Sequence, residues 1–154
     1  HIKNEIDLNI LIDEAYEFFL KERHKVVFYD QVVEVLESLV SRAMLGVLTN
    51  GNANVNKLGI GHLFEFSISS VDVKSNKPDS AHFIKAKEIS GIEFINTLHI
   101  GDHPINDVKG ARDLGISTMW FNSQNLTWDV DDNPPLMFNH WSQFMNLLSL
   151  HHEQ

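Results

Sequence analysis

The sequence predicts an α/β fold in which a parallel sheet lies between two layers of helices. Segments whose apolar residues recur at helical spacing alternate along the chain with short, continuous apolar runs. Such runs are typical of strands that are buried on both faces. Two of the helical segments are closed by a glycine, the usual residue after the last turn of a helix. The alternation favours helices that cover both faces of one sheet.

Two helical patterns come first. Residues 9–25 carry apolar residues at helical spacing with acidic residues between them, which predicts an amphipathic helix. Residues 30–42, DQVVEVLESLVSR, repeat the pattern, and Asp30 is the expected N-cap. The apolar positions are Leu11, Ile12, Ala15, Phe18 and Phe19 in the first pattern and Val32, Val33, Leu36, Leu39 and Val40 in the second.

The period then changes, because residues 44–48, MLGVL, form a continuous apolar run that predicts the first buried strand. Similar runs and periodic segments follow to the end of the chain. Further strands are expected at residues 66–69, 97–100 and 117–121, and helices at residues 80–90, 106–114 and 141–150, the last after a loop at residues 129–135.

Composition narrows the class of protein. The chain has 154 residues, of which 43% are hydrophobic, and this is enough for the core of one domain. The absence of cysteine excludes disulfides and cysteine-based metal sites. The net charge of -9 disfavours nucleic acid and anionic membranes as partners. No apolar run approaches the roughly 20 residues that span a bilayer, and no signal-peptide core is present, so we expect a cytoplasmic protein of undetermined oligomeric state.

A first polar cluster follows the first predicted strand. Thr49, Asn50 and Gly51 offer a hydroxyl, a side-chain amide and backbone N–H groups, which are donors suited to an anionic oxygen. In open α/β sheets, ligands bind beyond the carboxyl ends of the strands, and this cluster lies at such a position. The alternative interpretation is a plain capped turn.

A second cluster, GDHPIND, follows the third predicted strand. Asp102 lies in the loop, and Asp107 lies in the first turn of the next helix. Two carboxylates that converge there repel each other unless a cation or proton lies between them, and Mg²⁺ prefers such oxygen ligands. Alternatively, Asp107 only complements the N-terminus of the helix while Asp102 bonds to the turn.

The third cluster contains Lys77, which precedes a proline that restricts its backbone. Its ammonium group is suited to a phosphate, although a lone loop lysine is usually only solvated. In chain order, a hydroxyl, a lysine and an acidic pair occupy successive connections of one sheet. This combination predicts phosphate donors beside a metal site.

The histidines near these clusters are not expected to form a zinc site. His99 lies inside an apolar strand, where we expect it to be packed and hydrogen-bonded rather than a metal ligand. His103 follows four residues later, but the two positions straddle a junction between strand and loop instead of sharing one helical face.

The chain resembles the haloacid dehalogenase superfamily of phosphatases, especially the branch with a small helical cap inserted near the N-terminus. The matching stretches are VLTNGN at 47–52, SNKPDSAHF at 75–83 and HIGDHPINDVKGARDLGISTMWFN at 99–122. Their order and spacing both match. The resemblance implies a three-layer, Rossmann-like core and a small phosphorylated metabolite as substrate.

The resemblance also implies roles for the residues of the three clusters. Thr49 would bind the transferred phosphoryl group, assisted by Asn50 and the backbone of Gly51. Lys77 would neutralise the phosphoryl oxygens, so Thr49 and Lys77 are the expected catalytic residues of this chain. Asp102 and Asp107 would form the Mg²⁺ site, with Asp102 a direct ligand and Asp107 in support. The implied reaction is phosphoryl transfer to an aspartate, followed by hydrolysis.

One departure from the family pattern is serious. The family begins with a strand that ends in Asp-x-Asp-x-Thr and supplies the nucleophile, and no such motif precedes Thr49. We therefore expect residues 1–25 to be a remnant of the helical cap and residues 26–154 to be a core that lacks its first strand. That strand lies in the middle of the family's sheet, so a gap is expected between residues 44–48 and 97–100, with backbone groups unpaired.

Three interpretations follow. The preferred one is the larger part of a phosphatase whose nucleophile lies outside these residues, so that the chain alone is inactive. A second is a non-catalytic anion- or metal-binding module, favoured by the absent nucleophile. A third is dehalogenation, which the acidic pair disfavours because it suits metal-dependent phosphoryl transfer.

Overall fold

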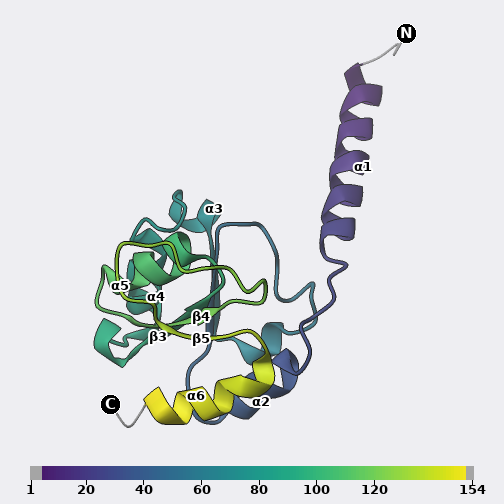
Figure 1. Ribbon diagram of the computed structural model, residues 1–154. Coiled ribbons are helices and arrows are strands. Elements are labelled where there is room, and N and C mark those ends of the chain that lie inside the picture. The colour runs from purple at the N-terminus through teal and green to yellow at the C-terminus, as the bar shows by residue number, and fades with distance from the viewer. Residues whose placement is uncertain (1–4, 152–154) are drawn as a thin grey trace.

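The computed structural model describes residues 5–151, so the ends of the predicted cap remnant and core, residues 1–4 and 152–154, lie outside the described part (Figure 1). The helices are α1 (Glu5–Arg23), α2 (Val32–Val40), α3 (Ser70–Val73), α4 (Ala81–Ser90), α5 (Gly110–Arg112) and α6 (Phe144–His151). The strands are β1 (Gly46–Thr49), β2 (Phe66–Ser69), β3 (Leu98–Gly101), β4 (Ser117–Phe121) and β5 (Leu136–Phe138). A π-helical segment covers Pro104–Lys109, and 3-10 turns cover Gly61–Leu63, Phe94–Asn96 and Trp141–Gln143. This alternation confirms the predicted α/β class.

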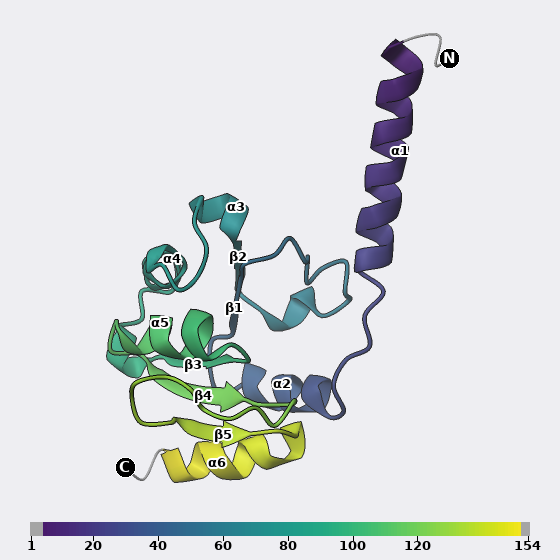
Figure 2. The same cartoon turned by 45° about the horizontal axis from the view of Figure 1, so that its top comes forward.

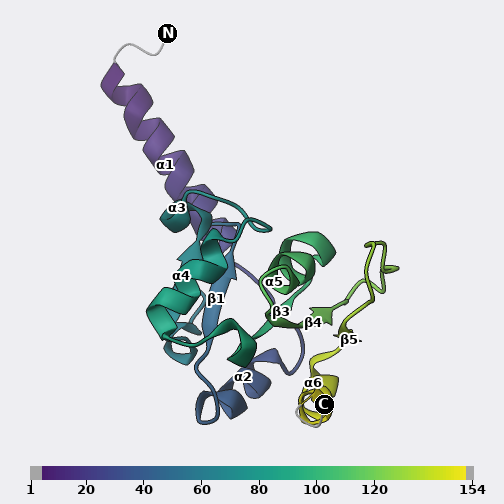
Figure 3. The same cartoon turned by 90° about the vertical axis from the view of Figure 1, so that its left-hand side faces the viewer.

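Every strand pairing in the described residues is parallel, as predicted. β1 pairs with β2, and β4 lies between β3 and β5. Within residues 5–151, however, β1 and β3 are not hydrogen-bonded neighbours, so the sheet is divided into a two-stranded and a three-stranded ladder. The two ladders lie apart in Figure 3. The break falls where the sequence leads us to expect a gap.

Helices cover both faces of the three-stranded ladder, as predicted for a three-layer, Rossmann-like fold (Figure 2). α2 and α6 pack against β4 and β5, and α4 and α5 pack together near the start of β4. The first group is held by Val35, Leu39, Met119, Phe121, Phe138 and Phe144, and the second by Phe83, Ala111 and Ile116. Burial of these apolar side chains is the main stabilising contribution to the core.

The strands differ in burial. β4 fits the prediction of a strand buried on both faces, since Met119 and Trp120 are fully buried. β1 and β3 do not fit it, because their residues are half-buried or exposed. Each of these two strands has a partner on one side only in the described residues, so its other edge faces the break in the sheet.

Two predicted helix starts were wrong. Asp30 is not the N-cap of α2, because Gln31 takes that position with a left-handed φ of 63° and the helix begins at Val32. The helix predicted at residues 106–114 begins earlier, with the π-helical segment from Pro104, and becomes α-helical only at Gly110. The wider turn arises because the N–H groups of residues 107 and 108 both donate to the carbonyl of His103.

The last strand, β5, was not predicted. Its three residues follow a Pro-Pro pair and provide too short a run for a period to be read. The structure still pairs it with β4, and Phe138 is buried in the core. The helix predicted at residues 141–150 is present as a 3-10 turn followed by α6.

α1 extends away from the rest of the molecule (Figure 1). Large apolar side chains along it are exposed, including Leu11 at 55% and Phe18 at 65%. The expected amphipathic helix therefore forms, but its apolar side chains have no core to cover within residues 5–151. In the same part of the chain, no helix combines the length and hydropathy needed to cross a bilayer.

Candidate active site

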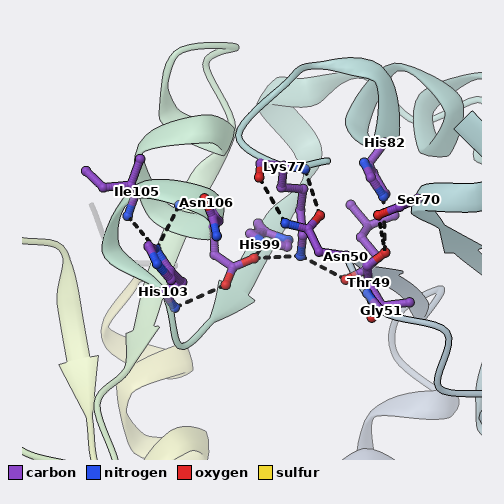
Figure 4. Close-up of polar contacts among 12 residues, drawn as sticks. Thr49, Asn50, Gly51, Ser70, Lys77, His82, His99, His103, Ile105 and Asn106 are labelled. Atoms are coloured by element: carbon purple, nitrogen blue, oxygen red, sulfur yellow. Dashed lines mark hydrogen bonds and ion pairs between the residues drawn. The ribbon is translucent and has the colours of Figure 1, made fainter. Parts of the chain in front are cut away.

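The three predicted polar clusters lie together at the carboxyl ends of β1 and β3 (Figure 4). Thr49 is the last residue of β1, and Asp102 follows the last residue of β3. Lys77 comes from the loop between α3 and α4 and contacts β1 and the segment that follows β3. The prediction that these residues share one edge of the sheet is supported by this arrangement.

The Thr49 loop is shaped by a short hydrogen bond of its own. The backbone N–H of Gly51 donates to Oγ1 of Thr49 at 2.9 Å. The hydroxyl accepts this bond, so its own proton remains available for donation to an oxygen atom. His82 and Ser70 contact the carbonyl oxygen of Thr49 from behind, at 3.2 and 3.4 Å. The hydroxyl of Thr49 is thus held by Gly51, and its carbonyl oxygen is held by His82 and Ser70.

Asn50 joins this loop to the lysine loop. Its Nδ2 donates to the carbonyl oxygen of Lys77 at 2.9 Å, and its Oδ1 accepts from the backbone N–H of Lys77 at 2.7 Å. The side-chain amide is therefore engaged with protein backbone at both ends. In this structure Asn50 positions Lys77. The side-chain amide of Asn50 is bonded to the lysine loop and is not directed toward a bound ligand.

Lys77 links β1 to the π-helical segment that follows β3. Its Nζ donates to the carbonyl oxygen of Leu48 in β1 at 2.8 Å and to Oδ1 of Asp107 at 2.6 Å. Only 8% of the lysine side chain and 7% of the aspartate side chain are exposed, so this ion pair is desolvated. A buried charge needs such partners. The ammonium has three donors, and the third remains for a further oxygen atom.

Asp107 is the most heavily bonded carboxylate of the site. Besides Lys77, Oδ1 lies 3.2 Å from Nε2 of His99, and Oδ2 accepts from the backbone N–H of His103 at 3.1 Å. Burial by itself raises the pKa of Asp107, but the hydrogen bond from His99 and the charge of Lys77 outweigh burial and lower it well below the ordinary value. Asp107 is therefore ionised at neutral pH.

Gly101 permits this approach of Asp107 to the end of β3. A Cβ atom on residue 101 would lie within van der Waals overlap of Asp107, 2.3 Å from its Cβ. Only glycine fits here without movement of the backbone or of Asp107. The glycine of the GDHPIND stretch thus has a packing role that its position in the sequence does not reveal.

Asp102 differs from Asp107. Its side chain is exposed at the start of the loop, and only its carbonyl oxygen has a partner, Nε1 of Trp120 at 2.9 Å. An exposed carboxylate suits Mg²⁺, which binds through one or two carboxylates while it keeps several waters. The exposed carboxylate of Asp102 therefore fits a ligand of a magnesium ion, whereas the carboxylate of Asp107 is bonded to protein donors. Among the residues whose side chains are described, no group of three or more His, Cys, Asp or Glu residues forms a closed metal site.

The structure adds His82, a site residue that the sequence reasoning missed. It is fully buried in α4 and contacts the carbonyl oxygen of Thr49 through Nε2. Burial lowers the pKa of His82, so the imidazole is neutral. Because Nε2 lies against a carbonyl oxygen, it carries the proton. No spacing or composition signal marks this histidine, since it becomes significant only through burial.

The expectation for His99 is confirmed. Its ring packs edge-on against Phe83 with the ring centroids 5.1 Å apart, and its Nε2 bonds to Asp107. His103 takes a different part, because its Nδ1 accepts from the backbone N–H groups of Ile105 and Asn106 at 3.2 and 3.1 Å. It therefore caps the π-helical segment that carries Asp107.

Comparison with known proteins gives the family. Residues 1–121 match the family model described as haloacid dehalogenase-like hydrolase. The chain belongs to the haloacid dehalogenase-like hydrolases. This family assignment confirms the resemblance seen in the sequence, and the solved structures similar to the chain have the same fold.

Two curated relatives of the haloacid dehalogenase-like hydrolases are phosphatases by name. The 5-amino-6-(5-phospho-D-ribitylamino)uracil phosphatase of Escherichia coli is 29% identical, over 84% of this chain and 56% of its own length. The phosphoserine phosphatase of Thermus thermophilus is also 29% identical, over 80% of this chain and 52% of its own length. The chain thus spans little more than half of these relatives.

A solved structure is more similar in sequence. The 2-haloacid dehalogenase from Pseudomonas syringae is 35% identical, with a TM-score of 0.91 over 97% of this chain and 65% of that one. The HAD-hydrolase YfnB from Bacillus subtilis, whose structure was solved bound to magnesium, is 24% identical with a TM-score of 0.74 and supports the fold.

A cleft lies between the two ladders of this haloacid dehalogenase-like chain. It has a volume of about 800 Å³ and is lined by residues of β1 and β3 together with apolar side chains of α4 and of the turn before β3. Leu48, His99 and Ile100 are among its lining residues. The Lys77–Asp107 pair lies near the end of the cleft at which β1 and β3 terminate.

Proposed function

We propose that this chain carries the phosphate- and metal-binding part of a Mg²⁺-dependent phosphatase that acts on small phosphorylated metabolites. The observation that carries the proposal is the position of Lys77. Its buried ammonium lies between Asp107 and the end of β1 that carries Thr49, and bonds within residues 5–151 use two of its three N–H donors. A fixed cation next to a hydroxyl donor is suited to the oxygens of a phosphoryl group.

Each site residue then has a role at a stated atom. The hydroxyl of Thr49 donates to a phosphoryl oxygen, and the backbone near Gly51 lines the same side. Lys77 neutralises charge through the third N–H of its ammonium. Asn50 holds Lys77 in place through two backbone hydrogen bonds. Asp102 holds Mg²⁺, which supplies Lewis-acid stabilisation of the phosphoryl oxygens when bound, and Asp107 fixes the lysine beside it.

The nucleophile in this proposal is an aspartate on a strand that occupies the cleft between β1 and β3. Four features support this view. The 154 residues contain no Asp-x-Asp-x-Thr motif, and the chain covers 56% of its Escherichia coli relative. The facing edges of the two ladders leave backbone groups available to an added strand, and apolar side chains line the space. Residues 1–25 are then the remnant of the cap, and residues 26–154 the core without this strand.

The proposal is tested on the longer gene product that includes an upstream strand. We expect it to release phosphate from p-nitrophenyl phosphate in the presence of Mg²⁺, and Asp102→Asn to reduce turnover by at least a hundredfold. Glu37→Gln, an exposed change on α2, is the matched control for the loss of a carboxylate. Absence of turnover, or equal turnover by wild type and Asp102→Asn, contradicts the proposal.

A companion experiment uses the chain of 154 residues alone. We expect no Mg²⁺-dependent hydrolysis of the same ester, because no aspartate of this chain lies in an Asp-x-Asp-x-Thr motif. Robust turnover by the purified chain, lost on Asp102→Asn, shows that the nucleophile is internal and removes this part of the proposal.

Dehalogenation is a second candidate, favoured by the 35% identity to the Pseudomonas syringae dehalogenase. It predicts chloride release from 2-chloropropionate that is insensitive to chelators. The exposed carboxylate of Asp102 beside the Lys77 pair favours the phosphatase, because a metal-free reaction does not need it. A non-catalytic module is the third candidate, and it predicts phosphate or Mg²⁺ binding by the longer product without turnover of either substrate.

A further inference from the structure

Arg23, the last residue of α1, lies against the phosphate-binding loop. A Cβ atom placed on Gly51 would lie 3.1 Å from Nη2 of Arg23 and 3.4 Å from Oγ1 of Thr49. The guanidinium and the hydroxyl therefore flank a single point directly above Gly51. α1 otherwise extends away from the core, so this contact is where the helix meets the site (Figure 1).

The neighbouring His24 fastens the end of α1 to the same region. Its Nδ1 bonds to the carbonyl oxygen of Leu20, so Nδ1 is the donor. Its Nε2 accepts from the backbone N–H of Asn54 at 3.1 Å. One imidazole thus joins the last turn of α1 to the segment that follows the Thr49 loop. The position of Arg23 over Gly51 is a consequence of this attachment.

Arg23 differs from Lys77 in its availability. Lys77 is buried and bonded to Leu48 and Asp107, whereas Arg23 is exposed. Among the side chains that the structure describes, no carboxylate forms an ion pair with Arg23. A guanidinium with no internal partner, in a chain of net charge -9, is free to bind an anion from outside.

Building on the phosphatase function proposed above, we propose that Arg23 binds a second anionic group of the substrate. The phosphoryl group takes the side of Thr49 where Lys77 lies, at the break between the ladders. Arg23 is exposed and lies over Gly51, on the other side of the same point from the Thr49 hydroxyl, so it is within reach of a second anionic group on an ester whose phosphoryl group is held at Thr49. The substrate class is therefore a small phosphate monoester that carries a carboxylate or a second phosphate close to the ester. A planar guanidinium binds either group through two parallel hydrogen bonds.

Equilibrium binding to the chain itself tests this inference without need of turnover. The probes are 2-phosphoglycolate, ethane-1,2-diol bisphosphate and ethyl phosphate, which carry a carboxylate, a second phosphate and no second anion. Titration calorimetry on the wild type should show tighter binding of at least one of the first two than of ethyl phosphate. Arg23→Met should weaken that binding by about tenfold and leave ethyl phosphate within twofold.

Lys21→Met is the matched control, because it removes one positive charge from the same helix end without a contact to the loop. It should leave all three affinities within twofold. Three outcomes overturn the inference. In the first, Arg23→Met weakens the binding of ethyl phosphate as much as that of the doubly anionic probes, and in the second, Lys21→Met weakens binding as much as Arg23→Met. The third is a wild type that binds all three probes equally. Comparison of the affinities for the bisphosphate and for 2-phosphoglycolate shows whether a phosphate or a carboxylate is preferred as the second anion.

The same probes separate this inference from the proposed function. Phosphate release from 2-phosphoglycolate by the longer gene product reports on the phosphatase, and the Arg23-dependent preference in binding reports on the arginine. If binding depends on Arg23 but no phosphate is released, the anion site at Arg23 is supported and the proposed phosphatase function is contradicted. If phosphate is released but Arg23→Met does not change the ratio of kcat/KM for 2-phosphoglycolate to kcat/KM for ethyl phosphate, the phosphatase function is supported and the role of Arg23 is contradicted.

Discussion

At the scale of single residues, the site depends on one buried ion pair that has two tasks. Lys77 and Asp107 sit 2.6 Å apart and provide the charge of the proposed phosphate site. Lys77 also bonds to Leu48 in β1, so the same ammonium connects the two-stranded ladder to the segment that follows β3. A residue chosen for chemistry therefore contributes to the stability of the fold as well.

Replacement of Lys77 by Met should destabilise the chain by about 3 kcal/mol, because it leaves Asp107 buried without its cation. Urea unfolding followed by circular dichroism measures this change. The double variant Lys77→Met with Asp107→Leu should recover part of the loss, since no buried charge is then left unpaired. Equal stability of Lys77→Met and wild type contradicts the buried pair.

The pH dependence of stability should carry the signature of Asp107. Its folded pKa lies below the ordinary value, so its stabilising contribution is complete above about pH 5 and is lost as the pH falls through the ordinary pKa of about 4 toward the folded value. The difference in unfolding free energy between wild type and Asp107→Asn should therefore be constant near neutrality and shrink below about pH 4. Urea unfolding across that range measures it, and a difference independent of pH contradicts the lowered pKa.

Sequence reasoning predicted that Thr49, Lys77 and Asp107 lie near the same strand ends, because polar residues that follow apolar runs can be recognised in the sequence, and the structure places them there. It did not find His82, and it gave Asn50 a direct part in phosphate binding where the structure shows its side chain bonded to the backbone of Lys77. Which atoms a side chain bonds to depends on segments distant in sequence. The Asn50 and Lys77 contact, for example, joins residues 27 positions apart.

At the scale of elements, the length of each apolar run predicted strands β1 to β4. The burial of each strand depends on its neighbours in the sheet, which the sequence pattern does not show. β1 and β4 both read as continuous apolar runs, and yet only β4 is buried, because β3 and β5 flank it. The π-helical turn at Pro104 was missed for a similar reason. It depends on backbone and side-chain acceptors of His103 that no periodicity reports.

Hydrogen exchange should reveal the open edges of the ladders. In the chain of 154 residues, the amides of β1 and β3 that point into the cleft should exchange at least tenfold faster than those of β4, because β4 is paired on both sides. Amide exchange followed by NMR distinguishes the strands residue by residue. Uniform protection of β1, β3 and β4 indicates that another segment or a second copy already covers the edges.

At the scale of the whole molecule, the cleft and the exposed helix α1 leave apolar surface uncovered within residues 5–151. The cleft of about 800 Å³ leaves apolar residues of β1 and β3 partly exposed, and α1 exposes Phe18 and Leu11. Both features lower the apolar area that folding buries, which is the main source of stability.

The longer gene product should therefore be more stable than the chain of 154 residues. We expect a higher midpoint of thermal unfolding and one cooperative transition, because a strand in the cleft pairs with both ladders and buries their apolar edges. Differential scanning calorimetry on both proteins measures this. Identical midpoints are the result that rejects a strand in the cleft.

The two hydrogen bonds between Asn50 and Lys77 also have a consequence for motion. They tie the loop after β1 to the loop before α4 at 2.7 and 2.9 Å, so these loops form one rigid unit. The bond from the backbone N–H of Asn54 to His24 attaches α1 to the segment after that loop. Movement of α1 away from the phosphate loop should therefore require this bond to break, and Arg23 would then leave its position over Gly51.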